Sequence, residues 1–225
     1  RLVKSNQYAP QSEAARFTHE FKKPIAVVMA LCTIFLLLTP WPVSSNWLLL
    51  AFSLLMLSAL YVIRLFPLNN ERRSLRELPL VKVFVVSAVW AVSTTVLPVM
   101  LANTTVSMDL RWMVIERWFF LMAITIPFDI RDMLVDDPTC KTLPQWVGIN
   151  KAKWVAAFFL VAMFLVNFLR LNAGYIREGV FLALLLVGLL SLFLIHRSKP
   201  DTDDMLFAGW LDGTMFLRGV LVLLA

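Results

Sequence analysis

Three aspartates lie at helical spacing at the point where an apolar stretch gives way to polar sequence. Asp129, Asp132 and Asp136 stand at positions i, i+3 and i+7, so a helix would place all three on one side. Like charges on one face repel each other unless a cation lies between them. Magnesium binds carboxylate oxygens together with phosphate oxygens and water. The spacing therefore indicates a site for magnesium and a diphosphate, and a solvated acidic helix end is the alternative.

The composition of the chain indicates the environment in which these aspartates lie. Of its 225 residues, 60% are hydrophobic, and the mean hydropathy is +0.76. A soluble domain of this size does not need so much apolar sequence, so we expect an integral membrane protein with the lipid bilayer as its partner. The net charge of +6 fits basic loops that face lipid headgroups, and we expect no nucleic-acid partner.

Seven stretches are apolar enough to cross a bilayer as helices, for which roughly 20 residues are needed. They are 24–41, 46–66, 80–101, 112–130, 152–170, 176–196 and 205–225. The chain is therefore predicted to form an all-α, polytopic membrane helix bundle with seven transmembrane helices.

Lysine and arginine are unequally divided between the two sides of this bundle. Sixteen fall on one side, and three, Arg111, Arg170 and Arg177, fall on the other. Because basic loops remain in the cytoplasm, the first side is predicted to be cytoplasmic. We therefore expect a protein of the cytoplasmic (inner) membrane whose aspartates face the cytoplasm.

The residues around and after the aspartates carry a resemblance to a known family. Residues 128–132, Asp136, residues 141–144 and Gly148 resemble the second aspartate-rich motif of the UbiA superfamily of intramembrane prenyltransferases. In that family a D-x2-D-x3-D run is followed by a basic residue, T-L-P and a glycine. Phe128 departs from the pattern, since many members have a polar residue there.

The resemblance implies roles for these residues and a length for the whole domain. It implies Mg²⁺ bound by Asp129, Asp132 and Asp136, which would also be the catalytic residues, with Arg131 and Lys141 contacting the substrate. The family has nine helices, and this motif follows the sixth, whereas here it follows the fourth predicted helix. We therefore expect residues 1–225 to be one membrane-embedded prenyltransferase-like domain comprising family helices three to nine. The first two helices and the first aspartate motif would precede Arg1.

A second set of candidate residues lies in and beside the polar stretch 67–79. A diphosphate needs cations besides magnesium, and arginine binds phosphate oxygens with two parallel hydrogen bonds. The family resemblance points to Tyr61 and Lys82 as rough counterparts of its tyrosine and lysine, with Arg76 as a further contact. For the neighbouring Arg72 and Arg73, an ordinary basic cytoplasmic loop is the favoured interpretation.

The function that this resemblance implies is transfer of a polyprenyl group. A prenyl diphosphate would be the donor, and the acceptor is not identified by the sequence. The alternative is a non-catalytic, divergent UbiA-like membrane scaffold or lipid carrier. Two charged residues in the last helix, Asp212 and Arg218, could line a substrate cavity or form structural ion pairs. Asp201, Asp203 and Asp204 are expected to be solvated.

Overall fold

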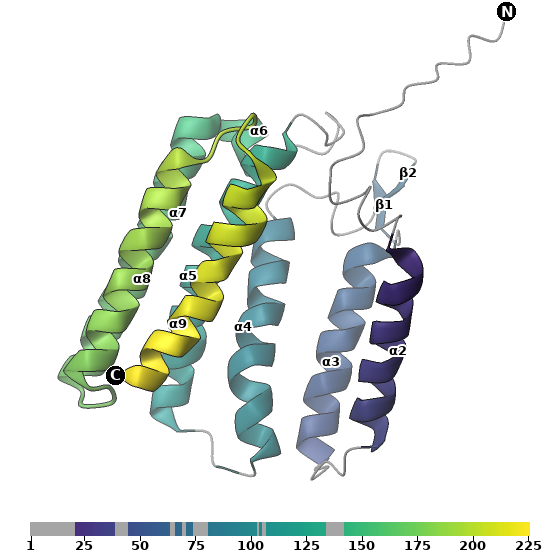
Figure 1. Cartoon of the computed structure of the whole chain (residues 1–225), viewed down its shortest axis with the longest axis horizontal. Helices are drawn as coiled ribbons and strands as arrows, with labels where there is room; N and C mark the ends of the chain where they lie inside the picture. Colours follow the sequence, from purple (N-terminus) through teal and green to yellow (C-terminus); the bar gives the residue numbers. More distant parts are fainter. Residues whose placement is uncertain are drawn as a thin grey trace, which may run out of the picture. The chain divides into compact units, whose positions relative to one another are not determined.

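A computed structural model describes residues 21–38, 45–63, 66–68, 71–73, 81–102, 104, 107–133 and 142–225. The chain divides into two compact units, Arg1–Pro42 and Val43–Ala225. In the first unit the structure describes helix α2 (Lys22–Leu38), whose sequence is apolar beyond its first three residues (Figure 1).

Where the structure describes it, the second unit is built almost entirely from helices. Its long helical elements are α3 (Ser45–Val62), α4 (Val81–Leu101), α5 (Met108–Asp132), α7 (Ile149–Asn172), α8 (Glu178–Arg197) and the π-helix η2 (Met205–Leu211), which continues as α9 (Asp212–Leu224). Two short strands, β1 (Phe66–Leu68) and β2 (Glu71–Arg73), pair antiparallel between α3 and α4. A five-residue helix, α6 (Leu143–Val147), lies between α5 and α7.

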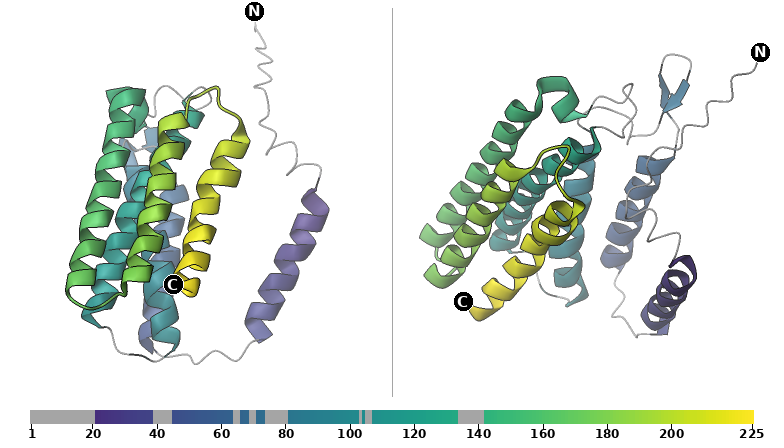
Figure 2. Two further views of the ribbon diagram at one scale, coloured as in Figure 1. Left: turned by 60° about the vertical axis from the view of Figure 1, so that its left-hand side comes forward. Right: turned by 45° about the horizontal axis from the view of Figure 1, so that its top comes forward.

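Helix α5 is the centre of the second unit. It packs between α4 and α7 (Figure 2). On one side α8 packs on α7 and α9 packs on α8, and on the other side α3 packs on α4. The core joins Phe120 and Ile124 of α5 to Leu160 of α7 and Val187 of α8, all of them almost fully buried. Gly188 allows α7 and α8 to pack closely, because a Cβ there would lie 2.4 Å from the ring of Phe164.

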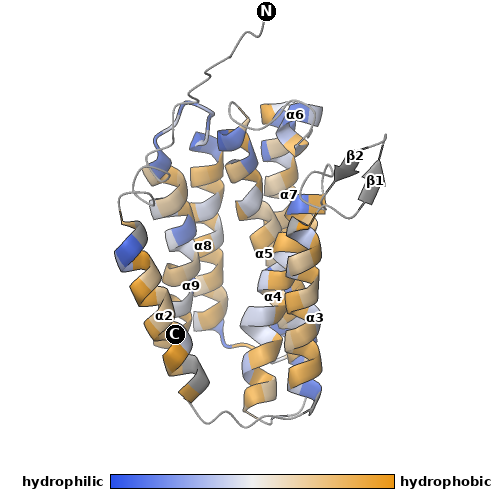
Figure 3. Ribbon diagram, turned by 90° about the vertical axis from the view of Figure 1, so that its right-hand side faces the viewer, coloured by the Kyte–Doolittle hydropathy of each residue, from blue (hydrophilic) through white to orange (hydrophobic). Residues whose placement is uncertain are grey.

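The outer faces of the helices are apolar. On α7, Trp154, Phe158, Val161 and Leu165 recur at helical spacing and are each more than half exposed. Among the described residues, four helical segments are long and apolar enough to cross a membrane: Val81–Leu101, Ile149–Asn172, Glu178–Arg197 and Met205–Leu224. In Figure 3 hydrophobic residues dominate the lengths of the helices, and hydrophilic residues gather at the end that carries α6. These features are those of an integral membrane protein.

The predicted helices are found at all seven positions, and the largest boundary differences, four residues each, are at the end of α3 and at the start of α5. The helix predicted to reach residue 66 ends at Val62, and Phe66 begins β1. Helix α5 begins at Met108 rather than at residue 112. The side chain of Ser107 accepts a hydrogen bond from the backbone N–H of Leu110 at 3.1 Å, and Asp109 adds a negative charge to the first turn. The apolar parts of α2 and α3, Lys23–Phe35 and Asn46–Tyr61, are shorter than the four apolar segments, and α5 carries charged residues along its length, so the number of seven spans stays a prediction.

Helix α6 explains residues that the sequence analysis assigned to a family motif. The side chain of Gln145 accepts a hydrogen bond from the backbone N–H of Thr142 at 3.0 Å, and Pro144 lies in the first turn, where it is well tolerated. Gly148 has a φ of +88°, a conformation that favours glycine, and turns the chain into α7. Pro144, Gln145 and Gly148 therefore have a local structural role in starting α6 and in turning the chain into α7.

Candidate functional site

The structure brings one predicted lysine and two predicted aspartates together from different helices. Lys82 Nζ lies 2.7 Å from Oδ1 of Asp129 and 3.9 Å from Oδ2 of Asp132. Lys82 is in the first turn of α4, and the aspartates are in the last turn of α5, which runs antiparallel to α4. The two aspartates are three residues apart, so they share one face of α5.

The three side chains differ in burial, from Asp129 in the interior to Asp132 nearest the surface. Asp129 is 1% exposed, whereas the side chains of Lys82 and Asp132 are 21% and 30% exposed. A carboxylate as buried as Asp129 requires a positive partner, because an isolated buried charge is costly. Lys82 supplies that charge while keeping access to the surface.

Arg131 links the end of α5 to the start of η2. Its Nε lies 2.8 Å from Oδ1 of Asp132, and one terminal nitrogen lies 3.8 Å from Oδ1 of Asp204. The guanidinium also lies over the rings of Phe128 and Phe207, at 5.2 and 5.6 Å from their centroids. Phe128, the departure from the family pattern, thus has a packing role against Phe207 and Arg131.

We refer to Lys82, Asp129, Arg131, Asp132 and Asp204 as the open cluster. Its three carboxylates and two cations carry a formal charge of −1, which favours a further cation. Two carboxylates one turn apart suit magnesium, which takes one or two protein carboxylates and completes its shell with phosphate and water. Among the residues that the structure describes, no three His, Cys, Asp or Glu side chains gather into a metal-binding group. Magnesium binding stays a prediction.

The remaining predicted site residues divide into one that is described and three that are not. Tyr61 is half-buried in the last turn of α3, at the same end of the second unit as Lys82. Asp136, Arg76 and Lys141 lie outside the described residues. The roles of all four stay predictions.

Two members of this region, Asp204 and Phe207, were not predicted from the sequence to belong to it. Asp204 was expected to be solvated, but its side chain, 39% exposed, faces Arg131. Phe207 was assigned no role, yet it is fully buried beneath the same guanidinium. The signal available was Arg131 itself, a cation at the end of an apolar helix that needs partners. Its partners lie more than 70 residues further along the chain, beyond the reach of local spacing.

A second set of charged and polar side chains, here called the sealed cluster, lies toward the N-terminal end of α5. It comprises Asp109, Glu116, Asn167, Arg170 and Arg218. Arg218 of α9 donates to Glu116, which also accepts from Asn167 at 3.3 Å. Arg170 Nε lies 2.8 Å from Oδ1 of Asp109. Arg170, the last residue of the predicted helix 152–170, lies within α7 and is 5% exposed, whereas the sequence had counted it among the cations of the outer side.

The last-helix charges have different surroundings. Arg218 is 5% exposed and lies over the ring of Phe120, so its observed role is a structural ion pair, one of the two interpretations that the sequence allowed. Asp212 is exposed.

Comparisons of this chain with protein-family models, with curated proteins and with solved structures find no match.

Proposed function

We propose that this protein transfers a polyprenyl group from a prenyl diphosphate to an acceptor, in a magnesium-dependent reaction within the membrane. One observation carries the proposal: Lys82 and two aspartates, from separate helices, converge at the polar end of an apolar helical unit. A diphosphate joined to a long hydrocarbon needs this combination of a charged site beside an apolar environment.

The residues of the open cluster have distinct roles in this proposal. Asp129 and Asp132, together with Asp136, would hold Mg²⁺, which neutralises charge on the departing diphosphate when bound. In the structure the Lys82 ammonium neutralises Asp129. If magnesium were bound by the carboxylates, the flexible Lys82 side chain would turn its ammonium group toward the phosphate oxygens. Arg131, held by Asp132 and Asp204, contributes positive charge at the rim.

The bonds made and broken follow from the donor. The bond between the allylic carbon and the diphosphate oxygen breaks, and its electron pair leaves with the diphosphate. The resulting allylic cation is attacked by a nucleophilic atom of the acceptor, which then loses a proton. Stabilising the leaving diphosphate is the step to which Lys82 contributes, since charge develops there in the transition state.

The proposal includes an arrangement in the membrane. Helices α2, α3 and α5 would cross the bilayer in addition to the four apolar segments, giving seven spans. The unequal division of lysine and arginine supports an orientation in which the open cluster faces the cytoplasm.

A second candidate function is a non-catalytic membrane scaffold or lipid carrier. It is favoured by the pairing within the open cluster, where Lys82 meets Asp129 and Arg131 meets both Asp132 and Asp204. It is also favoured by the local structural role of Pro144, Gln145 and Gly148, described above.

Consumption of a prenyl diphosphate separates the two functions. The full-length protein, reconstituted in vesicles, should consume a prenyl diphosphate with Mg²⁺ and stop when EDTA removes the metal. Asp129→Ala and Asp132→Ala should each abolish turnover, and Lys151→Gln, an exposed cation outside the open cluster, should leave it unchanged. Equal turnover in both aspartate variants and the wild type would overturn the site assignment, and no turnover in the wild type would favour the scaffold.

A further inference from the structure

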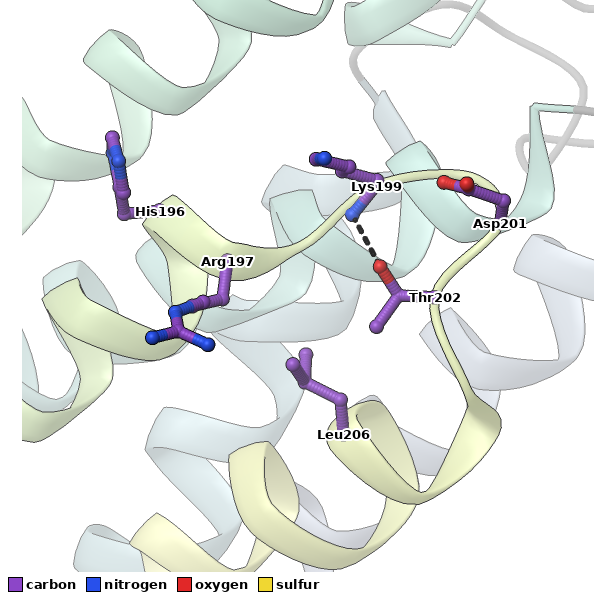
Figure 4. A pocket seen from close by; sticks show the side chains of 6 residues that line it. All are labelled: His196, Arg197, Lys199, Asp201, Thr202 and Leu206. Atoms are coloured by element: carbon purple, nitrogen blue, oxygen red, sulfur yellow. Dashed lines mark hydrogen bonds between the residues drawn. The ribbon is translucent and has the colours of Figure 1, made fainter.

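The turn between α8 and η2 contains an open pocket that belongs to neither cluster. Its volume is about 470 Å³, and Figure 4 shows the six side chains that line it: His196, Arg197, Lys199, Asp201, Thr202 and Leu206. Nothing in the proposed prenyl transfer uses these residues.

The lining combines both signs of charge. Figure 4 shows Arg197 and Asp201 at opposite sides of the set, with Lys199 and Thr202 between them. Arg197, Lys199 and Asp201 are all exposed. A pocket of this kind suits a ligand that carries a negative and a positive group a few ångströms apart.

Neighbouring acidic residues are engaged elsewhere. Oδ1 of Asp203 accepts a hydrogen bond from the backbone N–H of Met205 at 3.0 Å, which caps the start of η2. Asp204 faces Arg131 in the open cluster. Asp201 is therefore the carboxylate of this turn that is available to a ligand in the pocket.

Local hydrogen bonds fix the walls of the pocket. Lys199 N–H donates to the hydroxyl of Thr202 at 3.0 Å, and Thr202 N–H donates to the carbonyl of Lys199 at 3.1 Å. Lys153 of α7 donates to the carbonyl of His196 at 2.8 Å and so caps the end of α8. A pre-formed turn lowers the ordering cost of binding a ligand.

An apolar stripe on α8 leads to this pocket. Leu182, Leu186, Leu189 and Phe193 recur at helical spacing, and each is about half exposed. Arg197 lies one turn further along, and its guanidinium is 5.0 Å from the centroid of the Phe193 ring. In a membrane this stripe faces hydrocarbon, so Arg197 stands where acyl chains end and headgroups begin.

From the pocket and the stripe together, we propose that this turn binds one phospholipid whose headgroup carries a phosphate and a primary ammonium. The phosphate binds Arg197 and Lys199, and the ammonium donates to Asp201. The acyl chains lie along the α8 stripe. A phosphoglycerol headgroup lacks the ammonium. A choline headgroup lacks N–H groups that would donate hydrogen bonds to Asp201.

Lipid retention measured by native mass spectrometry tests this proposal. The full chain is purified in detergent and titrated with phosphatidylethanolamine, phosphatidylglycerol or phosphatidylcholine of matched acyl chains. Wild type is expected to bind the ethanolamine lipid about tenfold more tightly than the other two, the difference that one additional charge-assisted hydrogen bond supplies. Free phosphoethanolamine should compete poorly, because it lacks the chains that cover the α8 stripe.

Variants assign the contacts. Arg197→Gln combined with Lys199→Gln should weaken binding of all phosphate-bearing lipids, and Asp201→Asn should remove only the preference for ethanolamine over glycerol. Lys151→Gln, an exposed cation outside the pocket, is the matched control and should bind as wild type does. All three changed side chains of the pocket are exposed, so the variants should fold, which helical circular dichroism checks. Equal binding of the three lipids by wild type, wild-type binding by the pocket variants, or competition by free phosphoethanolamine at lipid-like concentrations would each overturn the proposal.

Discussion

The two charged clusters on α5 both pair carboxylates with basic side chains but differ in burial and in formal charge. In the sealed cluster, Glu116 and Arg218 are 1% and 5% exposed, and the side chain of Asp109 is 27% exposed. Its two carboxylates and two arginines have a formal charge of zero, and the neighbouring Arg117 interacts electrostatically with Glu116, Arg170 and Arg218. In the open cluster, Asp132 and Arg131 are each 30% exposed, and the formal charge is −1. The two clusters are about 20 Å apart along α5, as judged from Glu116 to Asp129 at 1.5 Å per residue.

The difference in burial and formal charge determines which cluster can exchange partners. A buried, balanced set of charges is held by its own members, and it joins α5 to α7 and α9. A graded set that reaches the surface with one excess negative charge can take up a cation and release it. The sealed cluster is therefore assigned to stability and the open cluster to ligand binding.

Breaking the sealed cluster should have the largest effect on stability. Arg218→Met removes the partner of Glu116 and leaves a buried carboxylate, which typically costs about 3–5 kcal/mol. Unfolding of the detergent-solubilised protein by SDS, followed by circular dichroism, measures the loss. Replacing both residues, as Glu116→Leu with Arg218→Met, should recover much of it, because the unpaired charge is then gone. A single variant as stable as wild type would contradict the assignment.

Breaking the open cluster should have a small effect on stability. Asp132→Asn removes a partly exposed ion pair with Arg131, and such pairs contribute under about 1 kcal/mol. Raising the salt concentration should shrink this difference further, because exposed charges are screened. The deficit of Arg218→Met should persist in the same titration, since its charges are buried. A loss in Asp132→Asn as large as that in Arg218→Met would erase the distinction between the clusters.

The residues differ in how far their surroundings could be predicted from sequence. The helix positions followed from apolar length alone, and the pairing of Lys82 with Asp129 joins two residues that the sequence had already assigned to one site. Asp204 and Asn167 were missed because their partners, Arg131 and Glu116, are reached only after the helices pack. Arg170 was counted with the cations of the outer side because an arginine at a helix end carries no local sign of burial until its partner Asp109 is known.

Binding of a non-hydrolysable prenyl thiolodiphosphate directly tests whether the open cluster binds magnesium and a prenyl diphosphate. Titration calorimetry of the full-length protein with and without Mg²⁺ should show magnesium-dependent binding in wild type. Asp129→Asn and Asp132→Asn should each weaken it at least about tenfold, the effect of losing one charge-assisted ligand. Glu116→Gln, a change of the same kind in the sealed cluster, should leave the affinity of the folded protein unchanged. Equal affinity in wild type and both aspartate variants, or a loss in Glu116→Gln alone, would contradict the account.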